Sequence, residues 1–495
     1  MSNTPIPLTY HYLTHHIIPG PQSVSYFIPL VLLHIAILIP RSSLPQWQSI
    51  SLFMPVIVGC TAHAWWEMGG VDVISVDRLL WALLLLVLRD PWKDFRRVIR
   101  GGGDVKGGGN ANKAGMEIRT GVPAAADGGG VSEQTTALIQ PTNHEVDRKA
   151  DLDSNKADWS VRMEDQPYPA TLYSRLSWVA VLLISIRLTN WKINTPSHDR
   201  SQPRLPAFHS RTAFAKHAVL SFIRGYIILD LTRAYISHDP YFTDPTVSIR
   251  SPLPSPTSLQ LAPPQLLRSL VVGAQAWALL SQMFYLPCLL PVGLHALGWL
   301  PDEWSPHNWP PYFGSPRAIF SQGVRGFWGQ YWHQTMRWSV SGPGYALANM
   351  MRLGSGSMLR YAVISAVAFG LSGVVHMGLV PPEPLHATVN PNTIRLCVAA
   401  FFWVQPLAMF GELLVARIFA RTTDLQYWQH GPALRLRMLA NGVWVIAWFT
   451  LALSLLGEAG RQLGYWRVWP VPVSVWQGVR GAGWVAWPVP LSHGK

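Results

Sequence analysis

The chain has 495 residues, of which 49% are hydrophobic and only 13% are charged. A soluble globular chain carries about 25% charged residues, so this composition excludes an ordinary soluble domain. Apolar runs of about 17 to 25 residues predict instead an all-α polytopic membrane protein, with roughly eight to ten transmembrane or re-entrant helices. The formal net charge of +13 favours anionic lipids and anionic ligands. Nucleic acid is not an expected partner, because the Lys and Arg residues lie in loops that flank apolar runs.

Residues 1–88 are predicted to hold the N-terminal membrane helices, in apolar runs at residues 26–40, 52–66 and 79–88. The polar start lacks the basic region of a cleaved signal peptide. Basic residues follow the third run directly, which marks the cytosolic side, and glycine triplets come next. This composition cannot bury enough apolar surface to fold. We therefore predict a disordered Gly-rich cytosolic loop over residues 89–171.

Residues 172–460 are predicted to form one helical membrane core. Its apolar runs are residues 176–188, 216–236, 266–300, 359–380, 396–417 and 439–456. Two prolines in the third run are expected to kink or break it. In the second run Asp230 lies within one turn of Arg233, and an intramembrane ion pair is the least costly way to keep both charges. Residues 461–495, rich in Trp and Pro, are predicted to form an interfacial tail.

Residues that indicate chemistry are concentrated between residues 318 and 376. Residues 318–338 have helical spacing and an aromatic face but too many polar groups to span, which predicts an amphipathic or re-entrant helix. This helix carries His333, and the next apolar run carries His376. Two imidazoles roughly 40 residues apart, one in a predicted membrane helix, indicate a catalytic site.

His376 lies among small residues, including Ser372, Gly373 and Gly378. An ionisable group in hydrocarbon is costly and is usually functional or paired, and small neighbours let a helix or a ligand approach closely. A neutral imidazole at this position is suited to act as general base on an alcohol. The alternative is a structural histidine that is hydrogen-bonded inside a helix bundle.

His333 also has a structural alternative, an interfacial histidine in an aromatic belt anchored by Trp332 and Trp338. Arg337, one turn later, is suited to pair with an anionic ligand, or to contact lipid headgroups as a snorkelling side chain. Glu412 is predicted to be the structural partner of Arg417 or of a buried donor. Nucleotide-binding, P-loop, zinc and serine-hydrolase motifs are not found in a usable context.

Several of these motifs together resemble a known domain. Phe327-Trp328, Trp332-His333 and Arg337, with Asp302-Glu303-Trp304 and Phe313-Gly314-Ser315-Pro316 before them, resemble the wax synthase domain of the membrane-bound O-acyltransferase superfamily. His376 is similar to the catalytic histidine of that superfamily. The segments that resemble fungal members of the domain are Arg187 with Trp191, Asp230-Leu231-Thr232-Arg233 and His238-Asp239-Pro240.

The resemblance implies acyl transfer from a coenzyme A thioester to an alcohol, in a central catalytic tunnel through the helices. His376 is expected to deprotonate the hydroxyl, and His333 to orient the thioester or to stabilise the oxyanion. The residues expected to bind substrate or coenzyme A are Trp328, Trp332, Gln334, Arg337 and Ser372. Acyl-CoA is the expected co-substrate, and neither a metal nor a permanently bound cofactor is expected.

Fungal-style features favour acetyl-CoA as donor and a hydroxyl of a hydrophobic terpenoid or meroterpenoid as acceptor. The expected location is the endoplasmic reticulum membrane. One alternative is a long-chain wax ester synthase. Another alternative, from a different class of protein, is a transporter or scaffold in which both histidines are structural. Transporters often show paired broken helices and internal symmetry. No matching halves are found in this sequence. The residues do not indicate an oligomeric state.

Overall fold

The computed structural model describes residues 24–67, 70–100, 163–185, 187–193, 208, 210–244, 246–254, 262–380, 390–422, 427–467 and 469–486. The chain divides into two compact units. The first is Met1–Arg97 with Gln166–Lys495, and the second is Val98–Asp165. Most of the loop predicted over residues 89–171 lies outside the described residues. At its ends the chain forms the short helix α5 (Pro91–Asp94) and the strands β1 (Phe95–Arg100) and β2 (Met163–Gln166).

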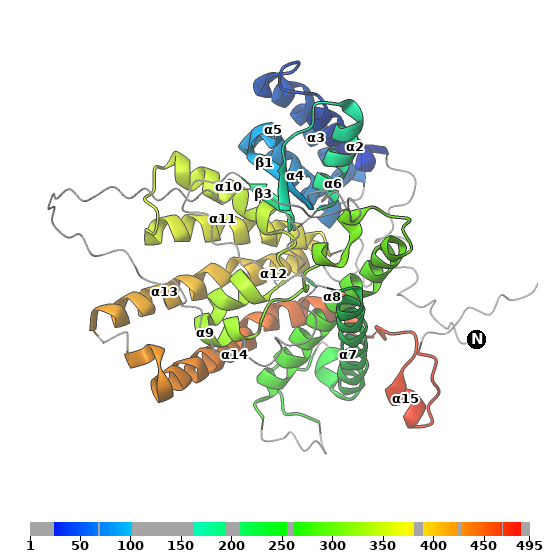
Figure 1. The fold of residues 1–495 in the computed structure, drawn as a ribbon. Helices are drawn as coiled ribbons and strands as arrows, with labels where there is room; N and C mark the ends of the chain where they lie inside the picture. Colours follow the sequence, from blue (N-terminus) through cyan, green and yellow to red (C-terminus); the bar gives the residue numbers. More distant parts are fainter. Residues whose placement is uncertain are drawn as a thin grey trace, which may run out of the picture. The chain divides into compact units, whose positions relative to one another are not determined.

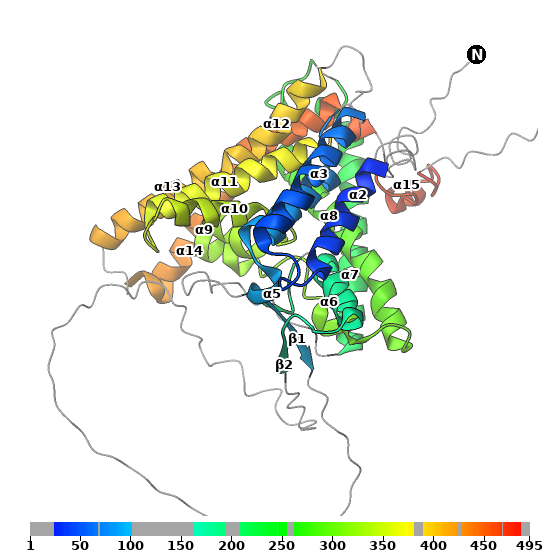
Figure 2. The same ribbon diagram turned by 90° about the horizontal axis from the view of Figure 1, so that it is seen from above.

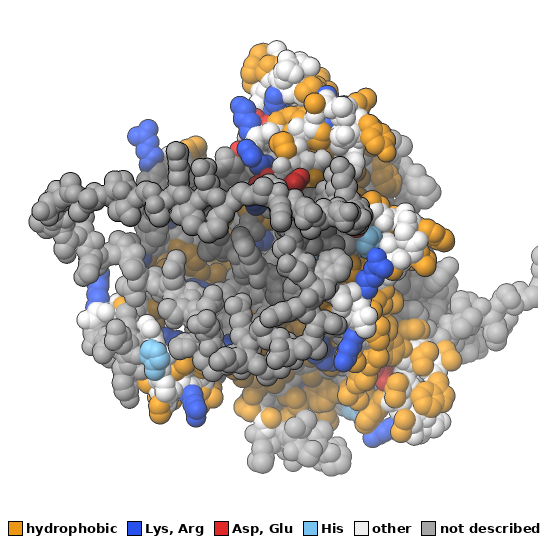
Figure 3. Space-filling model, viewed as in Figure 1, with side chains coloured by type: hydrophobic (Ala, Val, Ile, Leu, Met, Phe, Trp, Pro, Cys, Tyr) orange, Lys and Arg blue, Asp and Glu red, His pale blue; other side chains and the backbone are white. Residues whose placement is uncertain are grey.

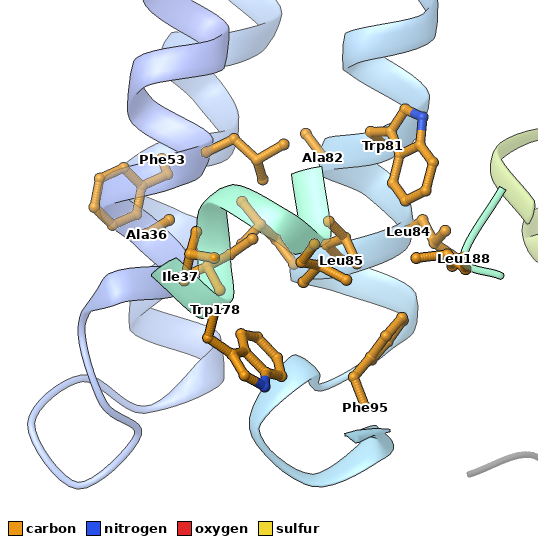
Figure 4. Close-up of a cluster of buried hydrophobic side chains, with 14 of the residues drawn as sticks. Ala36, Ile37, Phe53, Trp81, Ala82, Leu84, Leu85, Phe95, Trp178 and Leu188 are labelled. Atoms are coloured by element: carbon orange, nitrogen blue, oxygen red, sulfur yellow. The ribbon is translucent and has the colours of Figure 1, made fainter. Parts of the chain in front are cut away.

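The N-terminal helices pack around one apolar cluster. They are α2 (Val24–Leu38), α3 (Gln46–Glu67), α4 (Val73–Ala82), the π-helix η2 (Leu83–Leu88) and α6 (Leu172–Ile184). Figure 4 shows the side chains of this cluster, in which Trp178 of α6 and Phe95 of β1 lie below the helices. Strand β1 pairs antiparallel with β3 (Trp191–Ile193), with Arg97 opposite Trp191, and the strand order is β2-β1-β3. Sequence analysis did not predict these strands.

Two long helices, α7 (Arg211–His238) and α8 (Pro264–Ala296), pack along each other. α8 continues through Pro287 and Pro291 as one helix, so the predicted apolar run is not split into two. At the end of α7, the short helix η4 (Pro240–Phe242) turns the chain. Between α8 and the next helix lie the short turns η5 (Asp302–Trp304) and η6 (Pro306–Asn308).

The remaining helices include the one that carries His376 and the two that flank the segment with His333 (Figures 1 and 2). They are α9 (Arg317–Gly326), the π-helix η7 (Phe327–Tyr331), α10 (Arg337–Met350), α11 (Met358–Met377), α12 (Pro391–Trp403), α13 (Gln405–Thr422) and α14 (Gly431–Gln462). α11 lies between α10 and α12, and α14 packs on α8, α9 and α12. Two predicted helices are interrupted, because residues 318–338 break at Gly323 and after Tyr331, and residues 396–417 break at Val404. α10 was not predicted.

The short helices η8 (Tyr427–Gln429) and η9 (Tyr465–Arg467) lie before and after α14 in the chain. The C-terminal tail follows η9, contains α15 (Val475–Val479) and packs on α7. Asp230 of α7 accepts hydrogen bonds from the Trp469 indole (3.0 Å), the Ser474 hydroxyl (2.6 Å) and the Trp476 backbone N–H (2.8 Å). Arg233 donates to the carbonyl of Arg467 and lies 5.0 Å from the ring centroid of Trp469. Asp230 and Arg233 of α7 therefore both hold the tail.

Among the described residues, five helical segments are long and apolar enough to cross a membrane: residues 46–66, 264–296, 358–377, 391–421 and 431–462. Large apolar side chains stay exposed along them. Figure 3 shows hydrophobic side chains also on the surface at lower right, where α7, which packs on α8, lies. An exposed apolar surface of this kind suits contact with lipid tails. The prediction of an all-α polytopic membrane protein is confirmed.

Candidate functional site

The segment before α9 is tied to the end of α6 and to β1. Arg187 follows α6 and donates to the carbonyls of Pro310 (3.2 Å) and Pro311 (3.1 Å). Asn190 donates to the side chain of Asn308, and Arg97 forms an ion pair with Glu303. These polar contacts satisfy an irregular backbone that lipid could not satisfy. They place residues 310–313 against the segment that carries His333.

The π-helix η7 ends in a way that releases His333 from helical structure. The N–H of Trp332 donates to the carbonyl of Phe327 (2.7 Å), and Trp332 itself is extended. Gln334 donates to the carbonyls of Trp328 (3.1 Å) and Trp332 (2.6 Å). Arg337 donates to the carbonyl of Gly329 (3.2 Å) and to Gln334 Oε1 (3.1 Å). Gln334 and Arg337 therefore cap the carbonyl end of η7, a structural task beside the ligand contacts predicted for them.

His333 is packed between aromatic rings. It stacks on Tyr312, with ring centroids 5.3 Å apart and an interplanar angle of 15°, and its ring lies 5.5 Å from that of Trp332. Its Nδ1 is buried and has no hydrogen-bond partner among the described residues. Burial, with smaller contributions from nearby His376 and Arg187, lowers the pKa of His333 to about 3. His333 is therefore neutral at physiological pH.

His376 lies in the last turn of α11, where its own helix fixes its tautomer. Its Nδ1 is 2.7 Å from the carbonyl oxygen of Ser372, one turn earlier, and 3.5 Å from the Ser372 hydroxyl. A carbonyl only accepts hydrogen bonds, so the neutral ring carries its proton on Nδ1 and its lone pair on Nε2. The ring stacks on Phe402 of α12, with centroids 4.0 Å apart. The backbone bond and the stack together orient Nε2.

Trp328 joins the two histidines through a set of aromatic rings. Its ring lies 5.9 Å from that of Trp332 and 6.2 Å from that of Phe402. Its indole donates to Oε1 of Gln405 (3.1 Å), which also accepts from the indole of Trp448 (3.0 Å). The structure thus brings all seven predicted site residues, namely Ser372, Trp328, Trp332, His333, Gln334, Arg337 and His376, to one region between η7, α10 and α11.

Sequence analysis missed Tyr312, Phe402 and Gln405 as parts of this site. Gln405 had a usable signal, because a polar side chain in an apolar run is uncommon and usually marks a contact. The rings of Tyr312 and Phe402 had no such signal. Glu412, predicted to pair with Arg417 or a buried donor, accepts from the backbone N–H groups of Val324 (2.6 Å) and Arg325 (3.0 Å) and from an indole. Among the described residues, no group of three or more His, Cys, Asp or Glu side chains is arranged to hold a metal ion.

Comparison with known proteins points to the same segment. Residues 309–383, which include both histidines, match the "Membrane bound O-acyl transferase family". The chain is 26% identical to the acetyltransferase eriL of Hericium erinaceus over 63% of its own length and 74% of the relative. It is 28% identical to the acetyltransferase ple2 of Rhodocybe pseudopiperita over 57% and 65%. It is 39% identical to the acetyltransferase nanB of Aspergillus nanangensis over 15% and 17%.

Residues 309–383 are therefore similar to the membrane-bound O-acyltransferase family, and the chain resembles fungal acetyltransferases over more of its length. The predicted resemblance to fungal acetyltransferases of this superfamily is confirmed. The aligned regions span less than two thirds of nanB and of ple2. No solved structure matches the chain.

Proposed function

We propose that this protein is an O-acetyltransferase that moves the acetyl group of acetyl-CoA onto a hydroxyl of a hydrophobic secondary metabolite. The observation that carries the proposal is the bond from Nδ1 of His376 to the Ser372 carbonyl (2.7 Å), which leaves Nε2 as a proton acceptor. A second imidazole, His333, is linked to His376 through neighbouring aromatic rings, which supports a site that holds both. The names of the fungal relatives support acetyl as the transferred group.

In the proposed reaction, Nε2 of His376 takes the hydroxyl proton while the alcohol oxygen attacks the thioester carbonyl carbon. A carbon–oxygen bond forms, and the carbonyl oxygen carries negative charge in the tetrahedral intermediate. The carbon–sulfur bond then breaks, and the proton held on His376 passes to the coenzyme A thiolate. The products are the ester and free coenzyme A, and His376 is neutral again.

The acceptor and the place of the reaction belong to the same proposal. The protein lies in the endoplasmic reticulum membrane, and the hydrophobic alcohol reaches the site from the bilayer. Coenzyme A, which is charged, enters from the cytosolic face of that membrane. The net positive charge of the chain, +13, favours binding of the phosphates of coenzyme A. Both histidines retain some solvent-accessible surface although neighbouring helices surround them, which supports a lined space that substrates reach.

The test is ester formation by microsomes that contain the protein, supplied with labelled acetyl-CoA and a terpenoid alcohol. We expect His376→Ala to lower ester formation at least 100-fold, because loss of a general base costs about 10²–10⁴ in rate. His34→Ala is the matched control, since Nδ1 of His34 makes the same 2.7 Å bond to a carbonyl one turn earlier, in α2. Equal ester formation by wild type and His376→Ala would exclude the proposed mechanism.

Octanoyl- and palmitoyl-CoA, supplied to the same microsomes, distinguish acetyl transfer from wax ester synthesis. A strong preference for palmitoyl-CoA with a fatty alcohol would replace the proposed activity by the wax synthase alternative. No ester with any of the three donors, from protein that is folded in the membrane, would favour the transporter or scaffold alternative.

A further inference from the structure

Arg187 places a positive charge beside the candidate site. Its guanidinium donates to the carbonyls of Pro310 and Pro311 at 3.2 and 3.1 Å and lies 5.9 Å from the ring centroids of Phe284 and Tyr312. Two bonds use only part of the five N–H donors of an arginine. The side chain is also partly accessible, so it has donors left for a further contact.

The charge of Arg187 is not balanced by an acid in this part of the structure. Among the described residues, the titratable groups whose charge acts on Arg187 are the phenols of Tyr312 and of Tyr285, from α8, and neither is a carboxylate. Burial lowers the pKa of Arg187 to about 10, so the guanidinium is still charged at pH 7. An enclosed cation without a carboxylate attracts negative charge strongly, because the surrounding dielectric is low.

Arg187 is also connected to His333. Tyr312, whose ring lies beside the guanidinium, stacks on the His333 imidazole at 5.3 Å. The charge of Arg187 acts on His333. The site therefore combines one permanent cation with two imidazoles, an arrangement that suits a reaction in which an anion forms.

We propose that Arg187 stabilises the negative charge that develops on the thioester carbonyl oxygen when the alcohol attacks acyl-CoA. This inference rests on the proposed acyl transfer and adds a residue to it. Stabilisation of a developing oxyanion by a fixed positive group lowers the barrier without tightening the binding of the neutral thioester. Loss of one such group typically lowers kcat by about 10²–10³, so the charge of Arg187 is expected to affect kcat far more than KM.

Arg187→Gln and Arg187→Lys separate the charge from the hydrogen bonds. Both replacement side chains are able to donate to the carbonyls of Pro310 and Pro311, but only lysine keeps a positive charge. We expect Arg187→Gln to lower kcat for acetyl transfer by about 10²–10³ with KM for acetyl-CoA nearly unchanged. Arg187→Lys is expected to retain most of the activity at pH 7. Equal kcat values for the two variants would overturn the proposal.

The lysine variant provides a second, independent measurement through its pH profile. Arginine stays charged over the measurable range, whereas burial of the same strength would bring a lysine pKa of about 10.4 down to roughly 8. We therefore expect the kcat of Arg187→Lys to fall between pH 7 and 9 relative to wild type, as the ammonium loses its proton. Because this readout needs only the lysine variant, it decides the question even if Arg187→Gln does not fold. A profile parallel to wild type would count against a role for the charge.

Arg461 supplies the controls: it too donates to two backbone carbonyls, those of Asp244 (3.1 Å) and Val247 (2.9 Å), but its charge is paired with Glu458. Arg461→Gln and Arg461→Lys are expected to have the same kcat as each other and no altered pH profile. His376→Ala, measured in parallel, tests the proposed function itself. If His376→Ala is inactive while both Arg187 variants match wild type, acyl transfer stands and the inference about Arg187 fails.

Discussion

At the scale of single residues, the position of His376 depends on a glycine one turn earlier in α11. A Cβ atom at Gly373 would lie 2.8 Å from Cδ1 of Trp403 and 3.1 Å from the carbonyl oxygen of Ala399, both in α12. α11 and α12 therefore approach closely because Gly373 has no side chain. The ring of Phe402 on α12 stacks on His376, so the distance between the two helices also sets the orientation of the imidazole.

We expect Gly373→Ala to separate α11 from α12 and to disturb this stack. Overpacking costs about 1–3 kcal/mol, and a displacement of about 1 Å at a reacting group lowers a rate by roughly 10²-fold. The measurement is kcat for ester formation together with the thermal unfolding midpoint in detergent. Gly370→Ala is the matched control in the same helix, since a Cβ there meets nothing within 4 Å. Unchanged kcat in Gly373→Ala would show that helix spacing does not control the site.

Single residues also show which parts of the site the sequence could predict. His376 stood out as a polar residue in an apolar run, and its bond to Ser372 is local to one helical turn. Arg187 and Pro310 are 123 residues apart in the chain, and spacing along a sequence gives no measure of such a contact. Gln334 and Arg337 were predicted to face ligand, and their bonds to carbonyls of η7 follow from a helix end that the sequence pattern did not locate.

At the scale of elements, the break inside α9 is built by one glycine and one distant carboxylate. Gly323 has φ +67°, a backbone conformation that disfavours a side chain. The helix restarts at Val324, where Glu412 of α13 accepts two backbone N–H groups and so caps the new helix start. One continuous helix was predicted over residues 318–338, because an isolated glycine in a helical pattern is usually tolerated. That prediction was wrong, because the chain breaks at Gly323.

Gly323→Ala is expected to destabilise the protein and to reduce activity, because η7 follows the break directly. A residue with a side chain at this φ costs about 1–3 kcal/mol, and its Cβ would lie 2.8 Å from Cδ of Glu412. The thermal unfolding midpoint and kcat measure the effect. Gly411→Ala, next to Glu412 and with nothing within 4 Å of the new Cβ, should leave both unchanged. Equal midpoints for the two variants would show that Glu412 does not need a glycine opposite it.

At the scale of the whole molecule, the sequence predicted the membrane helices better than the connections between them. Bilayer thickness requires long apolar runs, and all five candidate spans overlap predicted runs. The short pairing of β1 with β3 and the packing of the tail on Asp230 depend on residues far apart in the chain. The His238-Asp239-Pro240 motif was assigned only by resemblance, and the structure gives Asp239 a physical role, as the partner of a buried arginine in α8.

Asp239 and Arg268 form an ion pair in which both side chains are 0% exposed. Arg268 donates two hydrogen bonds of 2.8 Å to the Asp239 carboxylate, and further bonds to carbonyls of residues 248–251. Asp239 also accepts from the Tyr235 hydroxyl (2.7 Å). This pair joins the end of α7, the start of α8 and the loop between them, at a distance in sequence from both candidate catalytic histidines.

We expect Asp239→Asn to destabilise the protein strongly, because removal of one partner leaves a buried charge uncompensated, at a cost of about 3–5 kcal/mol. The measurement is the thermal unfolding midpoint in detergent, and kcat per folded molecule should change little. Glu458→Gln is the control: Glu458 pairs with Arg461 at 2.6 Å but its side chain is 32% exposed, and exposed pairs contribute about 0–1 kcal/mol. Equal unfolding midpoints for the two variants would show that the buried ion pair does not join α7 to α8. The aromatic cluster around Tyr241 and Phe242 would then have to hold the two helices together.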